Sequence, residues 1–190
     1  MELLKNKILS ESEILPGSVL KVDSFLNHQV DVQLLSECGK VWYELFKNEG
    51  VTKILTIESS GIGIACITAQ YFGVPVVYAK KSRSATISND FYTSKVVSYT
   101  HGQSYEIFVS KKFIKPDDKI LIIDDFVANG SALKVLIHLA EKGGAKVVGA
   151  GVAIEKLDKD GGQRLRDIGY RVESLAKIKS LDNGKIEFAE

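Results

Sequence analysis

The sequence has no apolar run of the length that a membrane span requires, and no signal-like stretch at its N-terminus. A transmembrane helix needs about 18 or more apolar residues in succession. The first fifteen residues carry Lys5 and Lys7 but no long apolar core, so they do not resemble an export signal. We therefore expect a soluble, cytoplasmic protein without membrane association.

Cysteine and histidine are both scarce. Cys38 and Cys66 lie far apart in apolar segments with helical spacing, which fits neither the paired ligands of a zinc site nor a disulfide framework. We expect both to be buried free thiols in a reducing compartment. His28, His101 and His138 share no spacing that would form a metal site or a catalytic triad, so we expect structural or solvated side chains.

Net charge is nearly absent, because 25 Lys and Arg residues oppose 24 Asp and Glu residues. A formal charge of +1 gives no long-range field for collecting nucleic acid, so any anion has to be bound locally. What remains is the composition of an ordinary globular protein. The 190 residues, 45% of them apolar, can bury a core without disulfides, and we expect a single domain over residues 1–190.

The periodicity of the apolar residues predicts an α/β fold. After Asp31, which is suited to cap a helix, a helical stripe that includes Trp42 and Leu45 continues to Gly50 and is expected to be core. The expected strands after it are 53–57, 74–78, 104–109, 119–123 and 146–154, and the expected helices are 64–72 and 131–142. Apolar strands separated by helices indicate a mainly parallel sheet flanked by helices on both faces.

One long segment has no clear helical or strand pattern. Residues 82–99 are largely polar but include Ile87, Phe91, Tyr92, Val96 and Val97. A stretch of this length without regular structure is unusual in a compact domain and is typical of a functional loop or lid. We expect it to close over a bound substrate, since a lid excludes water from a reaction.

The strand at 119–123 leads directly into Asp124 and Asp125. In parallel α/β sheets, ligands gather at the carboxyl ends of the strands. Ionised carboxylates accept hydrogen bonds from paired hydroxyls such as those of ribose, and their charge stabilises a sugar carbon that becomes cationic. We interpret the pair as catalytic, although two adjacent acids also occur at ordinary solvated strand ends.

Two residues after the acid pair comes a run of five that we call the phosphate loop: Ala128, Asn129, Gly130, Ser131 and Ala132. Small residues let the backbone approach an anion, while the N–H groups and the dipole of the next helix face a phosphate. The side chains of Asn129 and Ser131 add possible donors. The alternative interpretation is an ordinary turn into a helix.

The strand, the two acids and the glycine-containing loop together resemble the type I phosphoribosyltransferases. That family commonly has Thr at the position of Asn129 and a hydroxyl residue at the position of Ala132, so one side-chain donor is lost here while the backbone donors remain. The resemblance implies transfer of a phosphoribosyl group from 5-phosphoribosyl 1-diphosphate (PRPP). It also implies Mg²⁺, carried mainly by PRPP with no direct protein ligand, and a homodimer.

Two further segments fit the family. The resemblance places a diphosphate-binding loop at Ser59, Ser60 and Gly61, and basic residues for the diphosphate at Lys80 and Lys81. The alternative for the first is an ordinary turn, and for the lysines a solvated strand end. In the family such lysines sometimes act across the dimer interface, and an arginine usually accompanies them.

Within the family the chain is closest to bacterial xanthine phosphoribosyltransferases, because the resemblance covers 20–31, 56–62, 122–130, 154–156 and 169–176. It implies a small hood over the base site, formed by residues of about 15–30 and a C-terminal segment, with Asn27 and the Leu20 backbone at the base. Phe126 can stack on a purine, although it can equally be core.

Lys156 bears on the choice of base. An ammonium group only donates hydrogen bonds, so it suits an exocyclic carbonyl and not the amino group of adenine. An exposed strand-end lysine is the alternative for Lys156, and a turn residue for Asn27. We therefore expect a purine-salvage enzyme that converts xanthine to xanthosine 5′-monophosphate. A hypoxanthine/guanine enzyme and a non-catalytic, PRPP-sensing regulator of the same fold are the alternatives.

Overall fold

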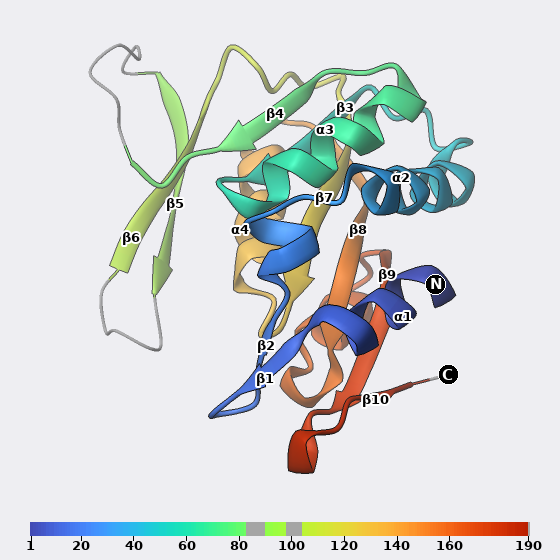
Figure 1. Cartoon of the computed structure of the whole chain (residues 1–190). Helices are drawn as coiled ribbons and strands as arrows, with labels where there is room; N and C mark the ends of the chain where they lie inside the picture. Colours follow the sequence, from blue (N-terminus) through green and yellow to red (C-terminus); the bar gives the residue numbers. More distant parts are fainter. Residues whose placement is uncertain (83–89, 98–103, 190) are drawn as a thin grey trace.

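A six-stranded sheet runs through the computed structural model, which describes residues 1–82, 90–97 and 104–189 (Figure 1). The strands lie in the order β10-β9-β8-β7-β3-β4, and all neighbours are parallel except β10, which is antiparallel to β9. Their bounds are β3 Lys53–Ile57, β4 Val76–Ala79, β7 Lys119–Val127, β8 Lys146–Lys156, β9 Val172–Ser180 and β10 Glu187–Phe188. The predicted mainly parallel sheet is confirmed.

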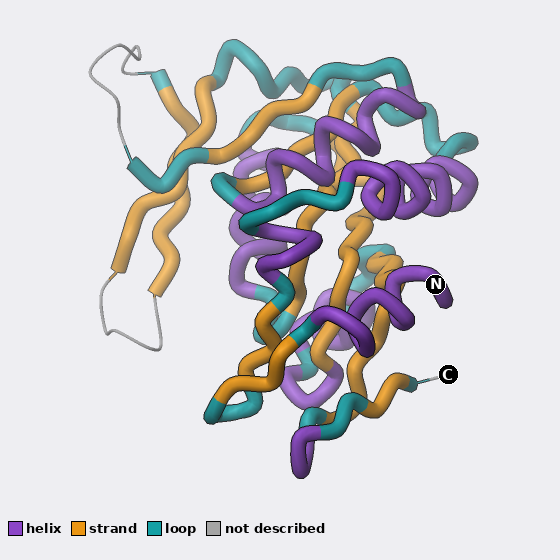
Figure 2. Tube along the Cα trace, in the orientation of Figure 1, coloured by secondary structure: helices purple, strands orange, loops and turns teal. Residues whose placement is uncertain are grey.

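Helices cover both faces of this sheet (Figure 2). Successive side chains of a strand point to opposite faces. Leu121 and Ile123 of β7 accordingly join one hydrophobic cluster, and Ile120 and Ile122 join the other. The first cluster lies beneath α1 (Glu2–Glu11), α2 (Val32–Phe46) and α3 (Ser60–Phe72), and the second beneath α4 (Ser131–Lys142) and α5 (Gly161–Asp167).

The N-terminal and C-terminal segments lie at the end of the sheet where β8 and β9 terminate (Figure 1). The strands β1 (Glu13–Leu15) and β2 (Val19–Lys21) form an antiparallel hairpin, and a short π-helix (Asp23–Asn27) follows it. At the other terminus, β10 pairs with β9. The role of these segments as a hood over a base stays a prediction.

A second hairpin projects from the body of the protein (Figure 1). It consists of β5 (Phe91–Val97) and β6 (Ser104–Ser110), and Lys80 joins it to the end of β4 through two backbone hydrogen bonds with Phe108, of 2.9 and 3.0 Å. The segment 82–99 was expected to be an irregular lid, but it contains β5. Residues 83–89 and 98–99 of that segment lie outside the described residues.

The helix α2 begins where the sequence predicted. Its N-cap is Asp31, whose Oδ1 accepts a hydrogen bond of 3.0 Å from the Leu34 N–H. In its stripe Trp42 is fully buried, whereas Leu45, expected to be core, is 38% exposed. Leu45 lies at the edge of the apolar stripe, next to the solvent-exposed face of the helix.

Three other boundaries or burial predictions were wrong. The helix α3 begins at Ser60 and not at residue 64, because the small residues before it enter the first helical turn. The strand β7 continues through both aspartates to Val127. Cys66 is exposed, since it lies on the outer side of α3, while Cys38 is buried and burial raises the pKa of its thiol to about 12. Both thiols are free, as expected.

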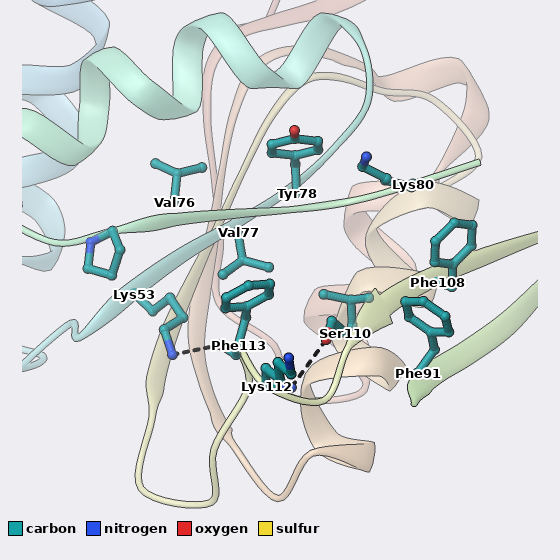
Figure 3. Close-up of a pocket in the computed structure, with 12 residues that line it drawn as sticks. Lys53, Val76, Val77, Tyr78, Lys80, Phe91, Phe108, Ser110, Lys112 and Phe113 are labelled. Carbon is teal, nitrogen blue, oxygen red and sulfur yellow. Dashed lines mark hydrogen bonds between the residues drawn. The ribbon is translucent and has the colours of Figure 1, made fainter. Parts of the chain in front are cut away.

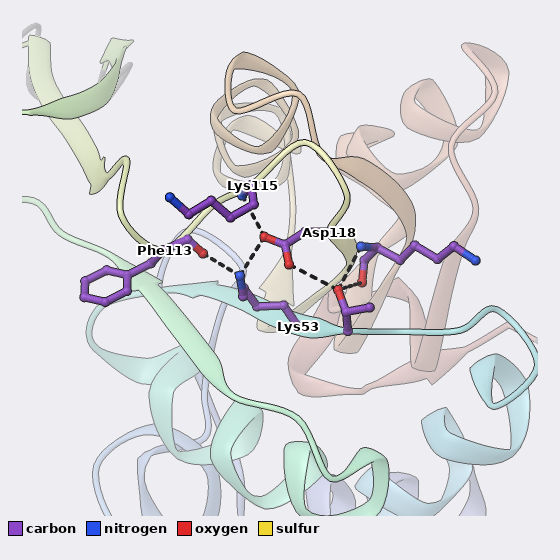
Figure 4. Close-up of polar contacts among 6 residues, drawn as sticks. Lys53, Phe113, Lys115 and Asp118 are labelled. Carbon is purple, nitrogen blue, oxygen red and sulfur yellow. Dashed lines mark hydrogen bonds and ion pairs between the residues drawn. The ribbon is translucent and has the colours of Figure 1, made fainter.

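An ion pair joins the N-terminal ends of β3 and β7 (Figure 4). Lys53 Nζ lies 2.6 Å from Asp118 Oδ2 and donates a hydrogen bond of 2.7 Å to the Phe113 carbonyl. The same carboxylate accepts from the Lys115 N–H at 2.7 Å and from the Thr52 hydroxyl at 3.3 Å. Burial alone would raise the pKa of Asp118, but Lys53 and the Lys115 N–H outweigh it and hold the pKa below its usual value.

Among the residues that the structure describes, no helix combines the length and the apolar character that crossing a membrane would demand.

The burial of Trp42 gives a first test of this fold. The ring is fully buried, and its Nε1 donates a hydrogen bond of 3.3 Å to the Glu173 carbonyl. We expect Trp42→Ala to lower the free energy of unfolding by about 3–5 kcal/mol, because it leaves a cavity. Leu45→Ala, on the same helix, should cost less than about 1 kcal/mol. Urea unfolding followed by circular dichroism measures both, and equal losses would contradict the packing described here.

Candidate functional site

Two adjacent carboxylates lie buried near the carboxyl end of β7. Asp124 is 3% exposed and Asp125 is 7% exposed, although both are acidic. The strand is covered on both faces, so its pleat carries each side chain into the interior. The neighbouring strands β3 and β8 run parallel to β7, and their carboxyl ends lie at the same edge of the sheet. The predicted acid pair therefore lies where a ligand of this fold class binds.

The two acids differ in their surroundings. Burial, and then the charge of Asp125, raise the pKa of Asp124 well above its ordinary value. The Asp125 N–H donates to Asp124 Oδ1 at 3.1 Å, and the amide of Asn27 donates to Asp125 Oδ2 at 3.4 Å. Asn27, predicted to contact a base, thus lies beside the acid pair. A cation arriving here would relieve the repulsion between the two carboxylates.

Gly61 lies in the first turn of α3, directly against the acid pair. A Cβ atom at this position would lie 2.8 Å from Asp124 Oδ1 and 2.1 Å from Thr56 Oγ1, so only glycine fits. The Thr56 hydroxyl is buried and has no hydrogen-bond partner within the described part of the chain. Ser59 is exposed, Ser60 is half-buried, and the peptide bond between Glu58 and Ser59 is cis. The loop predicted to bind diphosphate therefore adjoins the predicted catalytic acids.

The phosphate loop joins β7 to α4. Gly130 has a φ of 79°, a left-handed conformation that glycine adopts without steric cost. The side chain of Asn129 folds back, so that its Oδ1 accepts a hydrogen bond of 3.0 Å from the Ser131 N–H. Ala128, Ser131 and Ala132 are half-buried and Asn129 is exposed. In the first turn of α4 the Ser131 N–H is taken by Asn129, whereas the N–H groups of Ala132 and Leu133 have no partners within the helix and are available to an anion.

Lys80 and Lys81 follow β4, as expected. Lys80 is half-buried, and its Nζ lies 5.7 Å from the centre of the Tyr78 ring. Lys81 is exposed, and its backbone N–H donates to Glu58 Oε1 at 2.5 Å. This hydrogen bond joins the end of β4 to the segment that precedes Ser59. The charge of Lys81 also opposes, as a minor effect, the raised pKa of Asp124.

The residues predicted to contact the base come from three elements. Lys156 ends β8, and its ammonium donates a hydrogen bond of 2.7 Å to the Ser18 carbonyl in the turn of the β1–β2 hairpin. Leu20 of β2 is buried, which leaves its backbone as the part that can meet a ligand. Phe126 is half-buried and packs against the hydrophobic cluster beneath α1–α3, so packing accounts for at least part of this side chain.

The described histidines are solvated, one of the two alternatives expected for them. His28 and His138 are exposed, and His101 lies outside the described residues. The residues that the structure describes contain no cluster of three or more His, Cys, Asp or Glu side chains that would hold a metal ion.

The start of α5 packs against the phosphate loop, and the sequence did not predict this contact. Gly161 and Gly162 at the start of α5 are both buried, and the Gly161 N–H donates to the Ala128 carbonyl at 3.0 Å. Glu155 of β8 is 1% exposed, and its Oε2 lies 2.6 Å from a guanidinium nitrogen of Arg166 in α5. The adjacent glycines were the available signal, since such a pair marks a close approach of two backbone segments.

A cavity of about 690 Å³ lies elsewhere, beside β4 and the β5–β6 hairpin (Figure 3). Its walls are mainly apolar, and the lysines around it include Lys80. It is lined by Lys53, Pro75, Val76, Val77, Tyr78, Lys80, Phe91, Phe108, Val109, Ser110, Lys112 and Phe113. Neither Asp124 nor Asp125 lines it, so we place the chemistry at the edge of the sheet and not in this cavity.

Known proteins match the whole chain. The phosphoribosyl transferase domain family matches residues 28–184. A xanthine phosphoribosyltransferase from Ruminiclostridium cellulolyticum is 53% identical over 190 residues, which is 100% of both chains. A relative of the same name from Lachnoclostridium phytofermentans is 52% identical over 190 residues, covering 99% of this chain and 98% of the relative.

Solved structures show the same fold. The APRTase from Giardia lamblia, complexed with 9-deazaadenine, superposes with a TM-score of 0.78 at 22% identity, covering 93% of this chain and 98% of that one. The adenine phosphoribosyltransferase from Rhodothermus marinus gives a TM-score of 0.74 at 24% identity, with 93% and 97% covered. At these identities the likeness establishes the fold alone.

The raised pKa of Asp124 predicts an unusual dependence of stability on pH. An acid whose pKa is higher in the folded state destabilises that state as the pH rises above the unfolded value of about 3.9. Asp124→Asn should therefore unfold at a higher temperature than the wild type at neutral pH, and the gain should disappear under acidic conditions. Thermal unfolding of the ligand-free protein over a pH series measures this.

Asp118→Asn is the matched control with the opposite sign. The pKa of Asp118 is lowered, so its charge stabilises the folded state above the unfolded pKa, and this stabilisation is lost as the pH falls. The substitution should cost about 1–3 kcal/mol at neutral pH, since it removes charged hydrogen bonds. If both variants lost stability at neutral pH, the proposed environment of Asp124 would be wrong.

Proposed function

The chain belongs to the phosphoribosyl transferase domain family, and we propose that it is a xanthine phosphoribosyltransferase. The reaction joins xanthine to PRPP and releases xanthosine 5′-monophosphate and diphosphate. The observation that carries the proposal is the buried acid pair, Asp124 and Asp125, directly ahead of the glycine turn into α4. The xanthine phosphoribosyltransferases that match over the full length support the choice of base.

The phosphate loop holds the 5′-phosphate of the donor. Backbone N–H groups at the start of α4 and the dipole of this helix supply the attraction. The diphosphate lies towards Ser59, Ser60 and Gly61, with Lys80 and Lys81 supplying positive charge. In this arrangement the two anionic ends of PRPP lie on either side of Asp124 and Asp125. The family resemblance also favours a homodimer, in which such lysines can act across the interface.

The acid pair binds the ribose. Ionised carboxylates accept hydrogen bonds from the two ribose hydroxyls. Burial and the charge of Asp125 make Asp124 costly to ionise, so a positive charge beside it is stabilised more strongly than in water. The anomeric carbon becomes positive as the diphosphate departs, and the acids stabilise it at that moment. A purine nitrogen then attacks this carbon and forms the new glycosidic bond.

Mg²⁺ fits these residues. It prefers oxygen ligands, and it is commonly held by one or two carboxylates together with the phosphates of a substrate. The diphosphate and ribose hydroxyls of PRPP would carry the ion, with no direct protein ligand, and the negative charge of Asp124 and Asp125 would favour its approach to the site. When bound, Mg²⁺ neutralises negative charge on the leaving diphosphate.

The base lies between the end of β8 and the β1–β2 hairpin. Lys156 keeps two N–H donors after its hydrogen bond to Ser18, and these suit the exocyclic carbonyls of an oxopurine. The amide of Asn27 offers both a donor and an acceptor, so it can read a ring N–H and a neighbouring carbonyl. The Leu20 backbone contacts the base edge, and Phe126 can stack on the face of the purine.

Turnover with separate bases tests the proposed function. The protein is mixed with PRPP and Mg²⁺, and nucleotide formation from xanthine, guanine, hypoxanthine and adenine is followed by absorbance. We expect xanthine to be the preferred substrate and adenine to react slower by about 10⁴-fold, because Lys156 offers its amino group no acceptor. No turnover with any base would indicate a non-catalytic sensor of PRPP, and a large preference for guanine would favour the hypoxanthine/guanine alternative.

Substitution of Lys156 tests the basis of selectivity. Lys156→Ala should lower kcat/KM for xanthine by about 10- to 100-fold, since it removes a charged hydrogen bond, while the KM for PRPP stays close to that of the wild type. Lys146→Ala is the matched control, because this exposed lysine begins the same strand at its opposite end. An unchanged ratio of xanthine to adenine turnover in Lys156→Ala would remove Lys156 from base recognition.

A further inference from the structure

The phosphate loop and the start of α5 touch backbone to backbone. A Cβ atom on Gly161 would lie 2.2 Å from the Ala128 carbonyl oxygen and 2.3 Å from the Gly130 nitrogen. In the other direction, a Cβ atom on Gly130 would lie 3.0 Å from the Gly161 carbonyl oxygen. No side chain fits between the two segments. The loop therefore rests on α5, and the contact requires glycine on the α5 side.

An ion pair between the buried Glu155 and the half-buried Arg166 fixes α5 to the sheet. Glu155 Oε1 accepts from one terminal nitrogen of Arg166 at 2.9 Å, and Oε2 accepts from the other at 2.6 Å. The Arg166 Nε donates to the Val172 carbonyl at 3.1 Å. Gly162 makes room for this pair, since a Cβ atom there would lie 2.0 Å from Glu155 Oε1. Such a bidentate pair has a defined geometry, and here it attaches the helix to β8 and to β9.

The residue of β8 that anchors α5, Glu155, lies next to the start of the phosphate loop. Glu155 lies in register with Val127, the last residue of β7, and Ala128 of the phosphate loop follows at once. The helix α5 thus contacts the loop at one end and is anchored, through Arg166, beside the residue from which the loop departs. Any movement of the helix would shift the loop relative to its own strand.

The hydrogen bonds from α5 also determine which groups of the loop are free. The Ala128 carbonyl accepts from the Gly161 N–H at 3.0 Å, and the Asn129 carbonyl accepts from the Arg164 guanidinium at 3.2 Å. In a trans peptide unit the N–H points opposite to the carbonyl. Holding these two carbonyls towards α5 turns the next two N–H groups, those of Asn129 and Gly130, to the opposite side of the loop.

We propose that α5 positions the phosphate loop for the 5′-phosphate of the donor, with Gly161 and Arg166 as positioning residues that do not touch the substrate. The proposal rests on the proposed function, because it assigns the 5′-phosphate to this loop. It deepens that function by naming the part of the fold that holds the N–H groups of the loop in place before the phosphate binds. Preorganised donors need no rearrangement on binding and stabilise the charge more strongly.

Two ligand fragments separate this role from a general loss of structure. Ribose 5-phosphate carries the phosphate that the loop binds, whereas pyrophosphate binds at Ser59–Gly61 and the two lysines and leaves the loop free. In Gly161→Ala the added methyl group pushes the loop away from α5. We expect the Kd for ribose 5-phosphate to rise by about 10- to 100-fold, as misplaced binding groups commonly cause, and the Kd for pyrophosphate with Mg²⁺ to change by less than about twofold.

Gly63→Ala is the matched control for this substitution. Gly63 lies in α3, and the nearest atom to an added Cβ is Val30 Cγ2 at 3.8 Å, so the methyl group fits without movement. Both Kd values should stay at the wild-type level, measured by isothermal titration calorimetry. If Gly161→Ala raised both Kd values by the same factor, or left both unchanged, the positioning role would be overturned while the proposed function stood. A wild-type protein that bound neither ligand would overturn the proposed function and this proposal together.

Substitution of Arg166 gives an independent test, because this side chain binds Glu155 and Val172 and not the loop. Arg166→Met leaves Glu155 buried without its partner, and the double variant Glu155→Leu with Arg166→Met removes this uncompensated charge. We expect the double variant to regain thermal stability but to keep a raised Kd for ribose 5-phosphate. Arg171→Met, which removes a surface arginine paired with Glu173, is the control. Full recovery of ribose 5-phosphate affinity together with stability would show that Arg166 only stabilises the fold, and would overturn its positioning role.

Discussion

The rest of the site depends on the burial of two adjacent carboxylates in one strand. Asp124 and Asp125 are removed from water, and among the described residues they accept hydrogen bonds from the Asn27 amide and from the Asp125 backbone N–H. Neither donor carries a full charge, so these hydrogen bonds do not neutralise the pair. The sheet bears this cost because hydrophobic clusters cover both of its faces. Local destabilisation of this kind is characteristic of sites built for a ligand that brings the missing charge.

Much of this arrangement follows from the sequence, because the signals are local and repeated. The cap at Asp31, the alternation of apolar strands and helices, and two acids ahead of Gly130 each reflect a preference of a few neighbouring residues. The exact strand β3 and helix α4 were predicted for the same reason. The extension of β7 through Asp124 was not, since buried acids contradict the ordinary pattern of a strand.

Other features of the fold were not predicted, because they depend on contacts between segments that are distant in the sequence. The strand β5 has polar residues between apolar ends and does not alternate, and it is defined by its pairing with β6, which no local preference reveals. Cys66 faces outwards because of how α3 packs, although its neighbours in sequence are apolar. The role of Gly161 is visible only once the phosphate loop lies against it. A glycine pair signals a close approach, but not the segment that approaches.

The strand β8 ends in two residues with opposite tasks. Glu155 and Lys156 are neighbours, so the pleat sends their side chains to different sides, one towards Arg166 and the other towards Ser18. The lysine that we propose for base recognition therefore also anchors the N-terminal hairpin. Under the proposed function, base preference and the position of the hairpin depend on one side chain. A relative that replaced Lys156 would also have to anchor the turn at Ser18 by another contact.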